Sequence, residues 1–106
     1  MSDPIQIFKP WYGEAEHEAL RAPLESGWLG YGEKAREFEK RFAEYVGVKH
    51  AIALHSCTAA LHLTLKDLGI GPEDEVICPS LTWCSSANSA LYLGAKVVFC
   101  DVDERT

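Results

Sequence analysis

The 106-residue sequence predicts an α/β fold in which a parallel sheet follows an α-helical lead-in. Three short apolar runs, residues 51–54, 75–78 and 97–100, alternate with two helix-like segments, residues 58–68 and 82–93. Strands and helices that alternate at this spacing are typical of βαβ units with right-handed crossovers. The runs are almost wholly apolar, as parallel strands are when helices cover both faces of their sheet. We therefore expect a parallel βαβαβ arrangement from residue 48 onward.

Two helices are expected ahead of the sheet, over residues 14–26 and 33–45. Pro23 lies in the first, and because proline has no amide hydrogen, that helix should kink or end early. The second is amphipathic, with one apolar stripe made by Ala35, Phe38, Phe42 and Tyr45. A glycine follows each of the four expected helices and should end it. These glycines are Gly27, Gly47, Gly69 and Gly94.

Composition and charge exclude several classes of function. The chain is 47% hydrophobic and 25% charged, which is ordinary for a globular protein, and one compact domain is the default at this length. No window approaches the roughly 20 apolar residues of a membrane span, and the start does not resemble a secretion signal. We expect a cytoplasmic protein. The net charge of −6 argues against a nucleic-acid-binding surface.

The cysteines are interpreted as free, buried thiols rather than as disulfides or metal ligands. No secretion signal precedes them, and three lie within or beside apolar runs. No two are separated by the two to four positions typical of zinc sites, and the histidines do not supply that spacing either. The residues concerned are Cys57, Cys78, Cys84 and Cys100, with His50, His55 and His62. We expect no metal site.

Candidate site residues follow each apolar run, because ligands of parallel sheets bind at the carboxyl ends of the strands. After the first run, Ser56 and Thr58 introduce a helix whose first backbone N–H groups could bind a phosphate, although a simple N-cap is the alternative. After the second, Trp83 could stack on a planar ring or lie in the core. After the third, Asp101 and Asp103 are interpreted as solvated turn residues.

A glycine-rich loop at residues 27–32 contains two large aromatic residues, Trp28 and Tyr31. Such a loop can present aromatic faces to a ligand. Alternatively, Trp28 fills the core and the loop is only a connector. Spacing favours neither interpretation.

Six segments together resemble a known family. In order and spacing they are similar to the DegT/DnrJ/EryC1/StrS family, sugar aminotransferases that use pyridoxal 5′-phosphate (PLP). The segments are residues 26–29, 38–43, 56–63, 71–77, 79–83 and 93–99. The resemblance covers essentially the whole chain and implies the amino-terminal part of the large domain of a fold-type-I PLP-dependent transferase. Residues 1–47 would be its helical lead-in, and residues 48–106 the incomplete start of the PLP-binding domain.

The resemblance also implies roles for particular residues. Thr58 and Ala59 would give backbone N–H groups to the PLP phosphate, and Trp83 would stack on the pyridine ring. The loop with Trp28 and Tyr31 would lie near the substrate. Family members transfer an amino group from glutamate to a keto sugar nucleotide, in surface polysaccharide, lipopolysaccharide or amino-sugar biosynthesis, and normally act as homodimers.

Three departures from the family pattern qualify these expectations. Cys57 stands where glycine is usual, and Pro23 stands in a helix that normally has none. Family members are also roughly three to four times as long, and their Schiff-base lysine lies beyond the matched part, so no catalytic residue is assigned here. We expect an inactive, poorly soluble amino-terminal fragment. The alternatives are a non-catalytic remnant that binds a full-length subunit, or a dehydratase of the same family.

Overall fold

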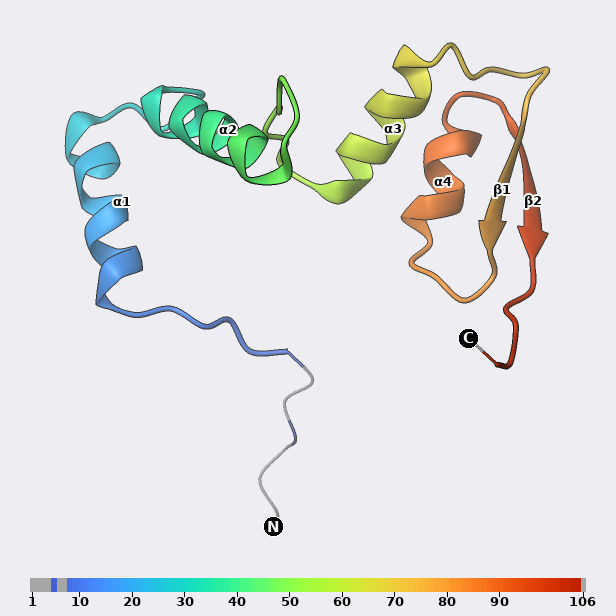
Figure 1. The fold of residues 1–106 in the computed structure, drawn as a ribbon, viewed down its shortest axis with the longest axis horizontal. Helices are drawn as coiled ribbons and strands as arrows, with labels where there is room; N and C mark the ends of the chain where they lie inside the picture. Colours follow the sequence, from blue (N-terminus) through green and yellow to red (C-terminus); the bar gives the residue numbers. More distant parts are fainter. Residues whose placement is uncertain (1–4, 6–7, 106) are drawn as a thin grey trace. The chain divides into compact units, whose positions relative to one another are not determined.

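The computed structural model describes residue 5 and residues 8–105. The chain divides into two compact units, Met1–Ala53 and Leu54–Thr106, rather than forming the single domain that its length suggests. The first contains helices α1 (Glu14–Ser26) and α2 (Glu33–Val46). The second contains helices α3 (Cys57–Asp67) and α4 (Ser85–Leu91) and strands β1 (Glu75–Pro79) and β2 (Lys96–Cys100) (Figure 1). The α/β class is confirmed.

Helix α1 has the expected bounds, and Pro23 does not shorten it. The backbone N–H of Gly13 donates to the Glu16 carboxylate at 2.6 Å, which satisfies a donor at the start of the helix. In the last turn, the Ser26 hydroxyl donates to the Pro23 carbonyl at 2.7 Å, and Gly27 N–H donates to Leu24 O at 3.2 Å. The expected early end is therefore wrong: α1 continues past Pro23 to Ser26, and the Pro23 and Leu24 carbonyls of its last turn are satisfied by these two donors.

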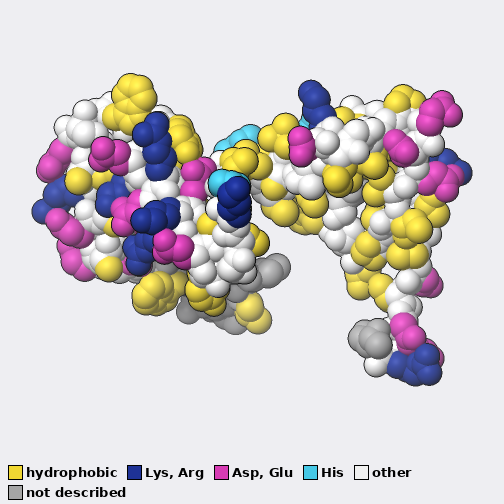
Figure 2. All heavy atoms as spheres, turned by 45° about the horizontal axis from the view of Figure 1, so that its top comes forward, with side chains coloured by type: hydrophobic (Ala, Val, Ile, Leu, Met, Phe, Trp, Pro, Cys, Tyr) yellow, Lys and Arg dark blue, Asp and Glu magenta, His cyan; other side chains and the backbone are white. Residues whose placement is uncertain are grey.

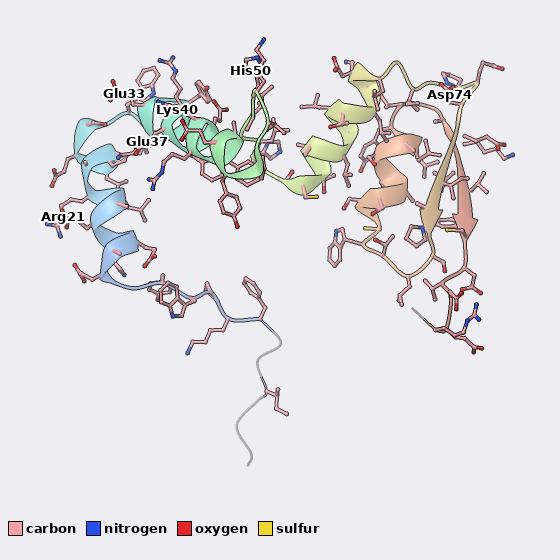
Figure 3. All side chains as sticks on the ribbon, in the orientation of Figure 1. Arg21, Glu33, Glu37, Lys40, His50 and Asp74 are labelled. Carbon is pink, nitrogen blue, oxygen red and sulfur yellow. The ribbon has the colours of Figure 1, made fainter. Side chains whose placement is uncertain are left out.

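Helix α2 confirms the expected amphipathic helix, but its apolar stripe is largely exposed. Phe38 and Phe42 lie with ring centroids 5.8 Å apart and are 57% and 47% exposed. The Glu37 carboxylate forms ion pairs with Lys34 and Arg41. Figure 3 shows Glu33, Glu37 and Lys40 projecting from the helix. Ala43 is the one residue of α2 that is buried among those described.

The second unit is built on one βαβ motif. β1 and β2 pair in parallel, in register from Glu75 with Lys96 to Pro79 with Cys100, and an ion pair joins Glu75 to Lys96 at the start of the ladder. Helix α4 lies between α3 and the two strands (Figure 1). Its buried residues are small, so the helix can approach the sheet closely. These residues are Ser85, Ser89 and Ala90.

Two sequence-based expectations about the sheet and its helices are wrong. Residues 51–54 form no strand in the described chain, so the sheet has two strands and not three. A strand requires a paired neighbour, whereas Ala53 N–H donates to the Glu39 carboxylate at 2.8 Å. Helix α4 is also shorter than residues 82–93. Residues 80–84 form a loop in which Trp83 O accepts the N–H of Ser86 at 3.0 Å.

The four glycines expected to end helices follow them, Gly27 and Gly47 as the C-caps of α1 and α2, and Gly69 and Gly94 just beyond the C-caps of α3 and α4. They are the positive-φ residues of the described chain, with φ between 69° and 80°. This left-handed conformation is open to glycine and strained for other residues. At Gly94 an added Cβ would also lie 3.2 Å from Pro72 Cγ, so two constraints favour glycine there.

Few side chains are buried in the described residues. The buried hydrophobic ones are small, namely Ala43, Cys78, Ala90 and Ala95, and many large ones are exposed. Hydrophobic side chains gather on the visible face of the second unit (Figure 2). All four cysteines are free, as expected, but the expectation of burial is wrong for three, which lie at a helix start, in a loop and at a strand end. Among the described residues, no helix is both long enough and apolar enough to cross a membrane.

Candidate functional site

The candidate site lies at the end of the second unit where β1 and β2 terminate. The amino-terminal ends of α3 and α4 lie at this same end (Figure 1). Asp74, just before β1, lies at the opposite end (Figure 3), where its carboxylate accepts the N–H of Gly71 at 2.8 Å. Strand ends and helix starts thus converge at the edge where parallel α/β sheets bind ligands.

Ser56 caps helix α3. Its backbone is extended (φ −159°, ψ 155°), and its hydroxyl accepts Ala59 N–H at 3.2 Å while its carbonyl accepts Ala60 N–H at 3.1 Å. The N-cap interpretation is therefore correct for Ser56. Ala59 N–H, one of the two groups that the resemblance assigns to the phosphate, is engaged by this cap. Thr58 N–H makes no hydrogen bond to the described residues.

The start of α3 has the chemistry of an anion site. The amino-terminal end of a helix carries partial positive charge and unpaired N–H groups, which favour phosphate. The first turns of α1 and α2 hold glutamates, Glu14 and Glu16 in one and Glu33 in the other, whereas the first turn of α3 holds no acidic residue. Thr58 and Ala59 are half-buried there. These residues fit a PLP phosphate.

Trp83 lies in the loop between β1 and α4 and is 77% exposed. The alternative that it belongs to the core does not hold in this structure. Its carbonyl is fixed by Ser86 N–H, so the backbone that carries the indole is tied to the start of α4. An exposed indole on a tethered loop can stack on a planar ring.

The loop at residues 27–32 folds onto itself. Trp28 is 66% exposed, its indole N–H donates to Tyr31 O at 3.1 Å, and a Cβ at Gly32 would lie 3.0 Å from its ring. Trp28 therefore does not fill the core; it covers the glycines of its own loop. A hollow of about 660 Å³ within the first unit is lined by α1, this loop and the first turn of α2.

Tyr31 is held by α2. Its hydroxyl donates to Glu39 Oε2 at 2.6 Å, and the Arg36 guanidinium lies 5.6 Å from its ring centre. The hydrogen bond to Glu39 raises the pKa of Tyr31. The same hydrogen bond is the larger cause that lowers the pKa of Glu39, and the hydrogen bond from Ala53 N–H lowers it further. Sequence reasoning did not single out Glu39, because one glutamate in a charged helix carries no local signal of these two partners.

The lysines of the second unit do not lie at the candidate site. Lys66 lies in the last turn of α3, and Lys96 opens β2 in an ion pair with Glu75. Both positions are at the opposite end of this unit from Ser56. The described residues also contain no group of three or more His, Cys, Asp or Glu side chains that could hold a metal ion. The chemistry available at the site is anion binding and ring stacking.

Comparison with known proteins identifies the family of the chain. The model of the DegT/DnrJ/EryC1/StrS aminotransferase family matches residues 10–106. The chain is 54% identical over 97 residues to the spore coat polysaccharide biosynthesis protein SpsC of Bacillus subtilis, covering 92% of this chain and 25% of that protein.

Two solved structures are also similar. Spr1654 from Streptococcus pneumoniae, in its PLP form, has a TM-score of 0.90 and 37% identity over 96% of this chain and 26% of that one. An aminotransferase from Psychrobacter cryohalolentis has a TM-score of 0.84 and 40% identity over 92% of this chain and 26% of that one. The chain spans about a quarter of the length of these relatives. It belongs to the DegT/DnrJ/EryC1/StrS aminotransferase family.

Proposed function

We propose that this chain is the amino-terminal part of a PLP-dependent aminotransferase that moves an amino group from glutamate to a keto sugar nucleotide. The observation that carries the proposal is the start of α3, a serine-capped helix end without acidic residues at the carboxyl edge of the sheet. It offers Thr58 N–H to an anion, and Trp83 lies exposed in a loop at the same end of the unit. Phosphate binding and ring stacking are the two contacts that hold such a cofactor.

The substrate class and setting are part of the same proposal. SpsC, a relative, is named for spore coat polysaccharide biosynthesis. This supports a role in making amino sugars for surface polysaccharides. A homodimer in the cytoplasm is the form that the family resemblance implies.

The chain's own residues bind and orient the cofactor in this proposal. PLP, when bound, supplies the electron sink for moving the amino group. The Thr58 N–H would hold its phosphate, and Ser56, whose hydroxyl accepts Ala59 N–H, fixes the helix turn that presents it. The Trp83 indole would cover one face of the ring and exclude water from it. The lysine that carries PLP belongs to another part of the enzyme.

The test of phosphate binding removes one N–H. Thr58→Pro takes the N–H from the second residue of α3, where proline is still tolerated in a first helical turn. Thr58→Ala is the matched control, since it removes the hydroxyl and keeps the N–H. In the natural protein that carries this chain, we expect Thr58→Pro to lose much more PLP than Thr58→Ala, at equal helix content by circular dichroism. Equal PLP content in the two variants would refute the assignment.

The test of the reaction uses the same natural protein. With glutamate and a keto sugar nucleotide, it should form 2-oxoglutarate and an amino sugar. A deoxy sugar without a new amino group would identify a dehydratase instead. A protein that retains no PLP but co-purifies with an intact aminotransferase would support the non-catalytic remnant.

A further inference from the structure

Glu39 contacts two segments that are distant in sequence. Its Oε2 accepts the Tyr31 hydroxyl at 2.6 Å, and its Oε1 accepts Ala53 N–H at 2.8 Å. Tyr31 belongs to the loop at residues 27–32, eight residues before Glu39. Ala53 lies 14 residues after it, at the end of the first unit and three positions before Ser56. One carboxylate therefore links the loop to the segment that leads into α3.

The loop is organised around Tyr31, so a contact to Tyr31 acts on the whole loop. Trp28 donates its indole N–H to Tyr31 O and its backbone N–H to the Ser26 hydroxyl at 3.2 Å. Ser26 in turn donates to the Pro23 carbonyl at the end of α1. The chain of hydrogen bonds thus runs from α1 through the loop to the Glu39 carboxylate.

A carboxylate suits this position because both partners are donors. The ionised form accepts through both oxygens at once, and these bonds are the stronger, charge-assisted kind. Both hydrogen bonds lower the pKa of Glu39, which keeps it ionised. Glutamine can meet both partners only without charge, because its oxygen can accept Ala53 N–H while its NH2 group donates to the Tyr31 hydroxyl oxygen. Both hydrogen bonds are then of the weaker, neutral kind. Aspartate is one methylene shorter and reaches less far.

We propose that Glu39 is a positioning residue that couples the loop at residues 27–32 to the segment leading into the start of α3. Its meaning for catalysis rests on the proposed function, in which the loop adjoins the substrate and α3 holds the cofactor phosphate. The coupling itself requires neither ligand. Movement of Tyr31 alters the bond that fixes Ala53, and release of Ala53 loosens Tyr31.

The test measures hydrogen exchange at the Ala53 amide, whose N–H donates to Glu39 and not to Tyr31. The purified protein is labelled in deuterated water and analysed by mass spectrometry with fragmentation that resolves residue 53. Tyr31→Phe removes one of the two hydrogen bonds that hold the Glu39 carboxylate in place, so the freed side chain should leave Ala53 N–H more often and raise its exchange roughly threefold. Tyr45 is an exposed tyrosine near the end of α2, and Tyr45→Phe should leave exchange at Ala53 unchanged.

The second arm asks whether the effect passes through Glu39. Glu39→Ala removes both hydrogen bonds, so it should raise exchange at Ala53, and adding Tyr31→Phe to it should raise exchange no further. The matched control is Glu44→Ala on the same helix, α2. If Tyr31→Phe leaves Ala53 exchange unchanged, or if the two effects simply add, the coupling is refuted. Should Glu39→Ala fail to fold, the comparison of Tyr31→Phe with Tyr45→Phe still decides.

A spectroscopic signature separates this role from general packing. The charged groups that face the Tyr31 phenol are Glu39 and Arg36, both on α2. Phenol absorbance, with the Tyr31→Phe spectrum subtracted, should show Tyr31 ionising at lower pH in Glu39→Gln than in the parent protein. An unchanged Tyr31 titration would overturn the proposal. Neither readout uses PLP, so failure here is distinct from loss of cofactor binding by Thr58→Pro.

Discussion

Replacement of Ser56 separates two roles that the start of α3 combines. The Ser56 hydroxyl accepts Ala59 N–H at 3.2 Å, a long and exposed hydrogen bond on an 11-residue helix. Loss of an N-cap costs roughly 0.5–2 kcal/mol, and we place Ser56→Ala near 1 kcal/mol because of that length and exposure. Ser56→Asn and Ser56→Asp both keep a side-chain acceptor. Asp also adds negative charge at the helix start, worth about 0.3–1 kcal/mol in favour of folding.

The same aspartate should weaken phosphate binding. Two like unit charges about 6 Å apart in a medium of effective dielectric constant about 20 repel by about 3 kcal/mol. That energy corresponds to roughly a hundredfold loss of affinity. Ser56→Asn has the same shape without the charge, so it isolates the electrostatic effect. We expect Ser56→Asp to be at least as stable as Ser56→Asn and to bind PLP far more weakly.

The assay combines urea unfolding, followed by circular dichroism, with equilibrium dialysis against PLP, on the natural protein that carries this chain. Equal PLP affinity of Ser56→Asn and Ser56→Asp would show that the phosphate does not lie at the start of α3. An unchanged free energy of unfolding in Ser56→Ala would show that the cap contributes nothing. The two results are independent of each other.

Four further predictions concern the fold, its charges and its exposed apolar side chains. Gly94→Ala and Gly69→Ala should each lose about 1–2 kcal/mol in urea unfolding, because both glycines are left-handed; Gly94→Ala should lose more, since its Cβ meets Pro72 Cγ at 3.2 Å, and equal losses would contradict this. The pKa of Glu39 is lowered, so its contribution to stability is present above the usual glutamate pKa and should fade as pH drops through the lowered value; the stability gap between the parent and Glu39→Gln should shrink in acid. The pKa of Tyr31 is raised, so its contribution is full below the usual tyrosine pKa and should be lost as pH rises through the raised value, measured against Tyr31→Phe. The 106-residue chain alone should self-associate and bind a hydrophobic dye, because its large apolar side chains are exposed; a sharp, cooperative melt of a monomer would refute this.

The helices were predictable because their signals are local. Glycine at the end of each helix acts through its own φ angle, and α1 and α2 have the expected bounds to within one residue. The prediction of a strand at residues 51–54 was wrong because strand formation depends on a neighbour that the sequence does not specify. The prediction that all four cysteines are buried was wrong for a similar reason. An apolar neighbourhood in sequence does not determine which side of a strand or loop is covered.

The helix start at the candidate site was predictable in the same measure. Ser56 and Thr58 identify a helix start at a strand-rich edge, and the structure places them there. The hydrogen bond from Ala59 N–H to the Ser56 hydroxyl was not predicted by name, although an N-cap at Ser56 implies a bond of this kind. Glu39 could not be found from sequence, because its two hydrogen bonds span eight residues in one direction and 14 in the other.

The positions of Lys66 and Lys96 limit what the second unit can do alone. Lys96 opens a five-residue strand whose far end lies at the candidate site, and such a strand spans roughly 13–16 Å. That length exceeds the reach of a lysine side chain, and Lys96 is already paired with Glu75. Lys66 lies in the last turn of α3, about 13 Å along the helix from its first turn. The proposed function therefore requires an amine from outside this unit, and it assigns to the unit itself the Thr58 N–H for the phosphate.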